Sequence, residues 1–308
     1  NNPTINTNNG AVRSIANASF EMFDVGWPFT RWAHIDQSAM RGWFTTAPSS
    51  QYAYCCSSGS DVVPGGSGRL IEVIPETNDF NNDPSPGYSI PNSPAPEGNY
   101  YAELNADYFS MLYQPICMAN GEVFNFSFYH HTRQINTTDI VEFRLGIPTS
   151  GLPANSVAGN SGYSRQIMRG SIQQGNTYAT VTPAVTSYTG TSALTSVVEA
   201  NGWVKYSGQH TLPASGWSGI FNLGFVSIQG TSNSAGNLLD SIQIDLTPLV
   251  DIGTTRDTSA SEGGSAHSIN IRINGKVASG MKVALRKIGG SATPVSYTHL
   301  TLPTILLV

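Results

Sequence analysis

Charged residues are scarce in this chain of 308 residues. Asp, Glu, Lys and Arg together make up 11% of it, as 20 acidic and 15 basic residues, and the basic residues form no cluster. A protein that neutralises nucleic-acid or lipid phosphates needs a concentrated basic surface. The sequence therefore predicts no nucleic-acid partner and no attachment to an anionic membrane.

Long apolar runs are missing as well. No stretch approaches the roughly 20 apolar residues that cross a bilayer as a helix. The sequence opens on the polar residues 1–4, without the basic and then apolar leader of a secretory signal. We therefore expect no membrane span and a mature form from which a leader has been removed.

Cysteine is rare, with three residues in the whole chain, Cys55, Cys56 and Cys117. Their spacing does not match a metal site, and an odd number leaves at least one thiol outside any intrachain disulfide. A bond between the adjacent Cys55 and Cys56 would be strained. We therefore expect any disulfide to join Cys117 to Cys55 or to Cys56.

The common catalytic motifs are absent too. The chain has no G-x-S-x-G, H-E-x-x-H, C-x-x-C, Walker or G-x-G-x-x-G sequence, which weighs against several classes of enzyme. A glycosidase or polysaccharide lyase stays open, because its paired carboxylates have no fixed sequence spacing. The candidates for such a pair are Glu72, Glu103 and Glu142.

Turn-forming residues are abundant, with 31 Gly and 18 Pro beside many Asn, Ser and Thr. No stretch shows the 3.6-residue apolar repeat of an amphipathic helix. Short apolar runs alternate with polar clusters from residue 17 to about residue 250, a pattern typical of β-sandwiches and jelly rolls. The predicted strands cover residues 70–74, 100–105, 123–133, 140–147, 219–228 and 237–246.

The predicted strand over residues 123–133 has the clearest alternation of apolar and polar side chains. Successive side chains of a strand point to opposite faces of the sheet. Phe124, Phe126, Phe128 and His130 therefore share the core face, and the same rule turns Val141, Phe143 and Leu145 of the next predicted strand inward.

If the strands over 100–105, 123–133 and 140–147 are neighbours, their remaining polar positions form one sheet face. Such side chains hydrogen-bond to sugar hydroxyls, and a tyrosine ring stacks on the apolar face of a pyranose. The alternative is a solvated face held by cross-strand ion pairs. The predicted ligand-binding residues are Tyr101, Glu103, Asn105, Tyr129, His131, Arg133, Glu142 and Arg144.

Several motifs follow one another in an order that resembles the jelly-roll domains of large secreted surface proteins of Bacteroidetes type. They lie at residues 17–21, 98–105, 112–117, 126–133 and 237–244. The resemblance implies a secreted or surface-displayed bacterial protein. It also implies a glycan-binding or adhesive function.

The first and last of these motifs, N-x-S-F-E and L-D-x-I-x-I, also resemble the terminal strands of galactose-binding-like carbohydrate-binding modules. In those modules two acids often hold a structural calcium ion. By that resemblance Glu21 and Asp240 are the calcium ligands here. Carboxylate oxygens are suitable ligands for this hard cation.

Two segments at the end of the sequence carry further resemblances. Residues 259–294 resemble the start of a Calx-β-type repeat of adhesins, with Glu262 at the position of a calcium-binding acid. Residues 295–304 match the translation of a sequencing-library adapter, which implies a metagenomic gene fragment. We predict a jelly-roll module over residues 1–250, a linker over 251–261, a truncated Calx-β-like repeat over 262–294 and non-native read-through over 295–308.

The predicted fold class is therefore all-β, a jelly-roll or lectin-like β-sandwich followed by a partial second sandwich. We expect a glycan-binding or adhesion module of a large bacterial surface protein, with calcium as a structural ion and no catalytic activity. The alternatives are a polysaccharide-active enzyme and a purely structural stalk module.

Overall fold

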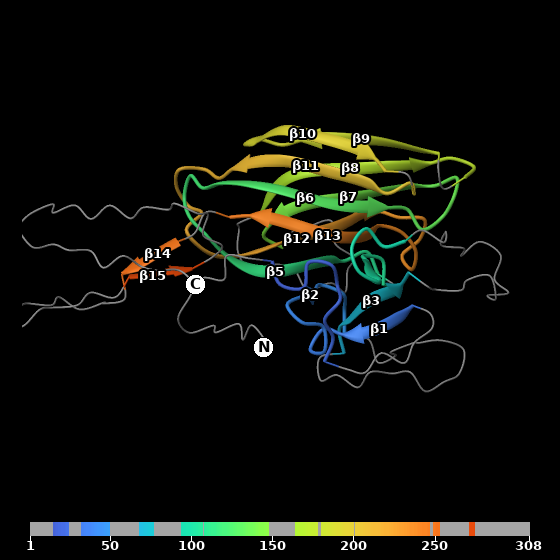
Figure 1. The fold of residues 1–308 in the computed structure, drawn as a ribbon, viewed down its shortest axis with the longest axis horizontal. Helices are drawn as coiled ribbons and strands as arrows, with labels where there is room; N and C mark the ends of the chain where they lie inside the picture. The colour runs from blue at the N-terminus through green and yellow to red at the C-terminus, as the bar shows by residue number, and fades with distance from the viewer. Residues whose placement is uncertain are drawn as a thin grey trace, which may run out of the picture. The chain divides into compact units, whose positions relative to one another are not determined.

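The computed structural model describes residues 15–24, 32–49, 68–76, 94–106, 108–147, 164–177, 180–199, 201–246, 249–252 and 271–274. All regular secondary structure in these residues is β-strand, which confirms the predicted all-β class (Figure 1). No helix in the described residues is long and apolar enough to cross a membrane.

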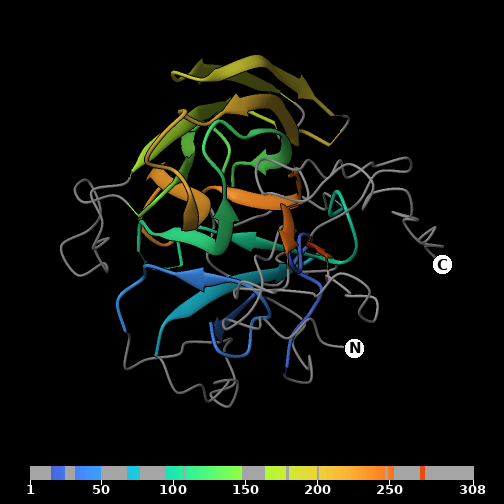
Figure 2. The same cartoon turned by 90° about the vertical axis from the view of Figure 1, so that its left-hand side faces the viewer.

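The strands form two antiparallel sheets that face each other as the layers of a sandwich (Figures 1 and 2). The first sheet contains, in spatial order, β1 (Ala33–Asp36), β3 (Leu70–Pro75), β4 (Tyr100–Glu103), β13 (Leu238–Asp245), β6 (Val123–His131), β11 (Val204–Thr211) and β10 (Thr191–Val198). The second sheet contains β2 (Phe44–Thr45), β5 (Met111–Met118), β12 (Gly219–Gln229), β7 (Thr138–Leu145), β8 (Arg165–Gln174) and β9 (Val181–Ser187).

Aromatic side chains from both sheets meet at the centre of the core. Phe128 of β6 lies 4.7 Å from Phe225 of β12, measured between ring centroids, and Phe143 of β7 lies 4.9 Å from Phe225. Phe126 lies 5.0 Å from Phe143. Because each ring removes a large apolar area from water, these contacts between the two sheets stabilise the sandwich.

All six strands predicted from the sequence are present, with ends that differ by a few residues. The alternation in β6 is confirmed, because Phe124, Phe126, Phe128 and His130 are all at most 3% exposed. The inward-facing positions of β7 are confirmed as well, since Val141, Phe143 and Leu145 are fully buried. The strands β1, β2, β5 and β8 to β11 were not predicted.

The strands β9 and β10 end the two sheets on the same side, uppermost in Figure 1. Residues 170–198, which include both strands, contain no Asp, Glu, Lys or Arg. Pro183 within β9 has no N–H to donate to a further strand. In β10 a bulge between Ser192 and Thr195, with Ala193 at a φ of 51°, interrupts the ladder.

A short antiparallel pair follows the sandwich, formed by β14 (Leu249–Ile252) and β15 (Ile271–Asn274). The strand β14 crosses the predicted boundary between the first domain and the linker, and β15 lies within the predicted second repeat. Glu262, Cys55, Cys56 and residues 295–308 lie outside the described residues. The domain boundaries, the disulfide and the origin of the last residues therefore stay predictions.

Candidate functional site

The eight predicted ligand-binding residues are divided between the two sheets. The strands β4 and β6 lie in the first sheet with β13 between them, whereas β7 lies in the second sheet. The condition that the three strands are neighbours is therefore not met, and the single face predicted from them was wrong. Which strands share a sheet depends on chain crossovers that alternation alone does not reveal. Tyr101, Glu103, Asn105, Tyr129, His131 and Arg133 belong to or follow strands of the first sheet, and Glu142 and Arg144 belong to the second.

The polar side chains of the first sheet are buried. None of Tyr101, Glu103, Asn105, His131 and Arg133 is more than 4% exposed, and only Tyr129 of this group is half-buried. Tyr101 and His131 each pack edge-on against Trp203, with ring centroids 5.5 and 5.2 Å away. Their predicted exposure was wrong, because further parts of the chain cover this face.

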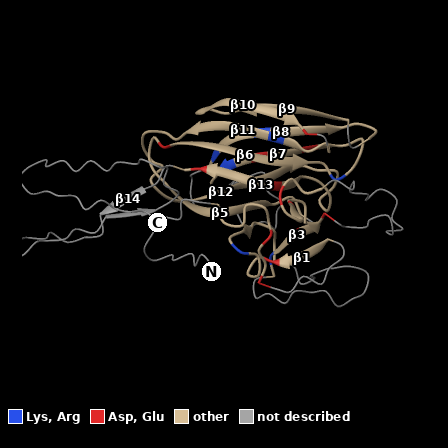
Figure 3. Cartoon of the chain, viewed as in Figure 1, with Lys and Arg blue, Asp and Glu red and all other residues tan. Residues whose placement is uncertain are grey.

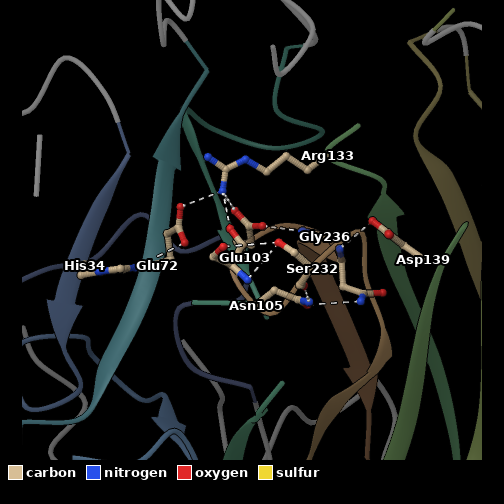
Figure 4. A network of polar contacts seen from close by, with 10 residues as sticks. His34, Glu72, Glu103, Asn105, Arg133, Asp139, Ser232 and Gly236 are labelled. Carbon is tan, nitrogen blue, oxygen red and sulfur yellow. Dashed lines mark hydrogen bonds and ion pairs between the residues drawn. The ribbon is translucent and has the colours of Figure 1, made fainter. Parts of the chain in front are cut away.

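Arg133 is the centre of a buried ion cluster on the first sheet (Figure 4). Its Nη1 donates to Glu103 Oε2 at 2.6 Å and to Glu72 Oε1 at 3.2 Å. The same nitrogen donates to the carbonyl oxygen of Ser234 at 3.2 Å. The Nε2 atom of His34 lies 3.4 Å from the other oxygen of Glu72. One cation therefore links β3, β4, the end of β6 and the loop before β13.

The two carboxyl groups of this cluster have different proton affinities. Glu72 and Glu103 lie opposite each other in the register of β3 and β4. Burial, the largest cause, raises the pKa of Glu103 well above its usual value in spite of Arg133. Burial also acts on Glu72, but Arg133 and His34 outweigh it, so the pKa of Glu72 is lowered.

A carboxyl pair with divergent pKa values is a feature of acid–base catalysis. Here both carboxyl side chains are at most 3% exposed, and both are bonded to Arg133. The third catalytic candidate, Glu142, lies in the other sheet. The geometry of Glu72 and Glu103 is that of a structural ion cluster that ties strands together.

We expect the substitution Arg133→Met to lower the free energy of unfolding by about 3 kcal/mol, because it leaves the buried Glu72 carboxylate without its cation. Urea unfolding measures this loss. The matched control is Arg41→Met, since Arg41 pairs with Asp24 at the surface and is 35% exposed, so its loss should stay below about 1 kcal/mol. Equal losses in the two variants would contradict a structural role for the cluster.

A second buried network, around Asn237, joins the two sheets. The Nδ2 atom of Asn237 donates to Ser227 Oγ at 2.9 Å and to the carbonyl oxygen of Gln229 at 2.7 Å. Its Oδ1 lies 2.9 Å from His130 Nε2, and its backbone N–H donates to Asp139 Oδ2 at 3.0 Å. The side chain of one residue therefore connects β13 to β6 and β12, and its backbone connects β13 to β7.

The predicted ligand residue Asn105 belongs to this network. Its Oδ1 accepts a hydrogen bond from Ser227 Oγ at 2.7 Å, and its Nδ2 donates to the carbonyl oxygen of Ser232. These bonds use the polar atoms of Asn105 inside the protein. Burial lowers the pKa of His130 to about 3, so its ring is neutral at physiological pH.

Burial raises the pKa of Asp139 to about 7, against an ordinary value of 3.8. The folded state therefore binds this proton more tightly than the unfolded state, and stability from this group is lost as the pH rises from about 4 to 7. We expect Asp139→Asn to remove this dependence. The wild type should lose about 1.4 kcal/mol per pH unit relative to the variant in that window, as measured by urea unfolding at several pH values. The exposed Asp245 gives the control Asp245→Asn, and a wild-type curve parallel to that of Asp139→Asn would disprove the assignment.

The second sheet carries polar side chains on the face that points away from the core. In the register of β7 and β8, Glu142 lies opposite Arg169 and Arg144 lies opposite Gln166. Glu142 Oε1 accepts from Arg144 Nη1 at 2.8 Å, and its Oε2 accepts from Arg169 Nη2 at 2.9 Å and from Gln166 Nε2 at 2.8 Å. We call Glu142, Arg144, Gln166 and Arg169 the Glu142 cluster.

The Glu142 cluster continues sideways into a row of positions across four strands. Gly224 of β12 lies opposite Arg144 on one side and opposite Tyr113 of β5 on the other. A Cβ atom at Gly224 would overlap the carbonyl oxygen of Leu112, so the close approach of β5 requires glycine. The row Tyr113–Gly224–Arg144–Gln166 therefore has an aromatic ring at one end, polar groups at the other and no side chain at Gly224.

Tyr113 is half-buried and stacks on Phe44 of β2, with ring centroids 5.9 Å apart. Sequence reasoning missed Tyr113, Gln166 and Arg169 as candidates for binding. It found Glu142 and Arg144 through the alternation in β7. The others lie on strands that were not predicted, so no pattern assigned them to a face.

The two calcium candidates converge on one segment, residues 97–100. Glu21 Oε1 accepts the backbone N–H groups of Asn99 at 2.7 Å and Tyr100 at 2.8 Å. Asp240 Oδ2 accepts the N–H of Glu97 at 2.9 Å. Burial, together with the nearby carboxylates of Glu97 and Glu21, raises the pKa of Asp240 to about 8.

Hard oxygen donors that repel one another suit a divalent cation such as calcium. Within the described residues, however, no three acidic, His or Cys side chains lie close enough together to form a metal cage. Glu21 and Asp240 would therefore bind calcium only together with backbone carbonyl oxygens or water. The residues fit the ion chemically, and both carboxylates also have structural hydrogen bonds of their own.

No protein-family model matches the chain, and no curated protein sequence matches it. Several solved structures are similar in fold. A carbohydrate-binding module of family 4 is 13% identical, with a TM-score of 0.33 over 76% of this chain and 100% of its own. A cyclase from Fischerella sp. TAU is 12% identical, with a TM-score of 0.40 over 78% of this chain and 98% of its own.

An adhesin domain of Lys-gingipain from Porphyromonas gingivalis is 14% identical, with a TM-score of 0.25 over 75% of this chain and 99% of its own. A binding module, an enzyme and an adhesin domain thus stand side by side among the similar structures. A shared fold does not select among such functions.

Proposed function

We propose that this chain is a secreted or surface-displayed bacterial module that binds glycans or mediates adhesion, and that it acts by binding without catalysis. The observation that carries the proposal is the row Tyr113–Gly224–Arg144–Gln166 on the outer face of the second sheet. It combines an aromatic ring with guanidinium and amide donors, which is the combination that recognises sugars.

The spacing along this row suits a sugar ring. Neighbouring strands are about 4.8 Å apart, so Tyr113 and Arg144 are separated by about 10 Å across β12. A sugar bound along this face would contact the half-buried Tyr113 ring on one side and the exposed edge of the Arg144 guanidinium on the other. Gly224 has no side chain between these two groups, and its backbone is buried, so the sugar would rest on the flanking side chains.

The burial of the polar residues on the first sheet supports the choice of the outer face of the second sheet. Its polar residues Glu103, Asn105 and Arg133 are bonded to other protein groups and are at most 4% exposed. Their part in ligand binding is therefore not included in the proposal. Half-buried Tyr129, with Lys205 Nζ 5.4 Å from its ring centroid, is an aromatic candidate there.

We expect Tyr113→Ala to weaken glycan binding by about tenfold or more, because it removes the stacking surface. Binding is measured by titration calorimetry with the best ligand from a panel of plant, bacterial and animal polysaccharides. The matched control is Tyr129→Ala, which removes a half-buried tyrosine from the other sheet and should leave the affinity unchanged. If Tyr129→Ala alone abolished binding, the assignment of the face would be wrong. A panel without any ligand would favour a structural stalk.

We also propose that calcium binds at Glu21 and Asp240 as a structural ion. Bound near residues 97–100, it would neutralise the carboxylates of Glu21, Glu97 and Asp240 and fix the segment that leads into β4. The support is the convergence of both predicted acids on this segment. Ca²⁺ there would stabilise the fold without contacting a ligand on the second sheet.

We expect calcium to raise the midpoint of thermal unfolding on the order of 5 °C over a sample in EDTA, because an ion that binds only the native state stabilises it. The variant Asp240→Asn should lose most of this shift. Asp24→Asn, which changes an exposed acid paired with Arg41, should keep it. A wild-type protein with the same midpoint in calcium and in EDTA would remove calcium from the proposal.

A further inference from the structure

The Glu142 cluster has more hydrogen-bond donors than its own acceptors use. Each arginine has five N–H donors. In the described part of the chain, Arg144 donates to Glu142 and to Ser164 Oγ, and Arg169 donates to Glu142. The buried Nε atoms of both arginines have no hydrogen-bond partner there. Because these Nε atoms are buried, they are not accessible to a ligand. The donors that a ligand can reach are those of the 38% exposed Arg169 guanidinium that do not bind Glu142.

The single acid in the cluster is already saturated. Glu142 is fully buried, and its two oxygens accept from Arg144, Arg169 and Gln166. The Tyr188 hydroxyl also interacts with Glu142 and with both arginines. A ligand hydroxyl would have to compete with these donors for Glu142. The cluster is therefore better suited to a ligand that accepts hydrogen bonds than to one that donates them.

The charge on the outer face of the second sheet also favours a ligand that accepts hydrogen bonds. The strands of the second sheet carry two acids, Asp139 and Glu142, and three arginines, Arg144, Arg165 and Arg169. Asp139 points into the core, where it is bonded to Asn237, and Arg165 points to His210. Two arginines and one glutamate remain on the outer face of these strands, a net charge of +1, on a chain whose net charge is −5.

Accessibility differs within the cluster. The Arg169 side chain is 38% exposed, while that of Arg144 is 11% exposed. Arg169 therefore reaches solvent while Glu142 holds its guanidinium in a fixed direction. A guanidinium group fixed in this way binds a planar carboxylate with two parallel hydrogen bonds at low entropic cost.

From these observations we infer that the glycan recognised on the second sheet is acidic, and that Arg169 binds the carboxylate of a uronic-acid residue. This inference rests on the proposed glycan-binding function and specifies the ligand class of the same site. The sugar chain runs from the half-buried Tyr113 toward β8, and the uronic-acid carboxylate meets the exposed Arg169 guanidinium there. Arg144 adds positive charge to the same cluster, and Gln166 occupies an acceptor site of Glu142 by donating to its Oε2.

The test is titration calorimetry of the full chain with trigalacturonate and with its methyl ester, which has the same ring and linkage without the charge. We expect the acid to bind about tenfold or more tightly than the ester, as a charge-assisted contact implies. Added salt should reduce this preference, because Arg169 is partly exposed. Arg169→Gln should abolish the preference by reducing the affinity for the acid to about that for the ester.

The matched control is Arg41→Gln, because Arg41 has similar exposure, 35%, and is also paired with one acid, Asp24. It should leave both affinities unchanged. If the ester binds as tightly as the acid, or if Arg169→Gln weakens both equally, the acidic ligand is wrong while glycan binding stands. If neither these oligosaccharides nor any neutral glycan binds, the proposed function itself fails.

Discussion

The fold requires hydrogen-bond partners for the polar groups that are buried where the two sheets meet. Asn237 is the centre of the network that provides them. Its amide and backbone bond to groups on β6, β7 and β12. A buried polar group without a partner costs free energy comparable to a lost hydrogen bond, so this residue also fixes the loop before it. The fixed loop brings the N–H of Gly236 to Glu103 and the carbonyl oxygen of Ser234 to Arg133.

The polar side chains of the two sheets therefore have different roles. The first sheet uses its polar side chains for internal bonds, as the contacts in Figure 4 illustrate. Charged residues are sparse along the ribbon (Figure 3). The second sheet keeps a row of polar and aromatic side chains at least partly accessible. The Glu142 cluster differs from the Arg133 cluster mainly in the exposure of its cations, since the Arg133 side chain is 4% exposed and that of Arg169 is 38% exposed.

The sequence predicted the fold class and the inward face of β6 and β7, because a strand that packs one face on a core must alternate. It did not predict β8, where Arg and Gln flank the buried Ile167, Met168 and Ile172, nor β9 and β10, which are mostly exposed and rich in Thr and Ser. It also could not place Glu103 or Arg133 in the interior. A buried ion pair and an exposed one have the same sequence pattern, and only the packing of distant segments distinguishes them. For the same reason Arg169 and Tyr113 were recognised only in the structure.

The edge that β9 and β10 form carries no charged residue. Many edge strands avoid unwanted pairing by carrying charges, and such repulsion weakens as ionic strength rises. Here the missing N–H of Pro183 and the bulge at Ala193 interrupt pairing through the backbone itself. Neither device depends on charge, so the protection that it gives against strand pairing is not screened by salt.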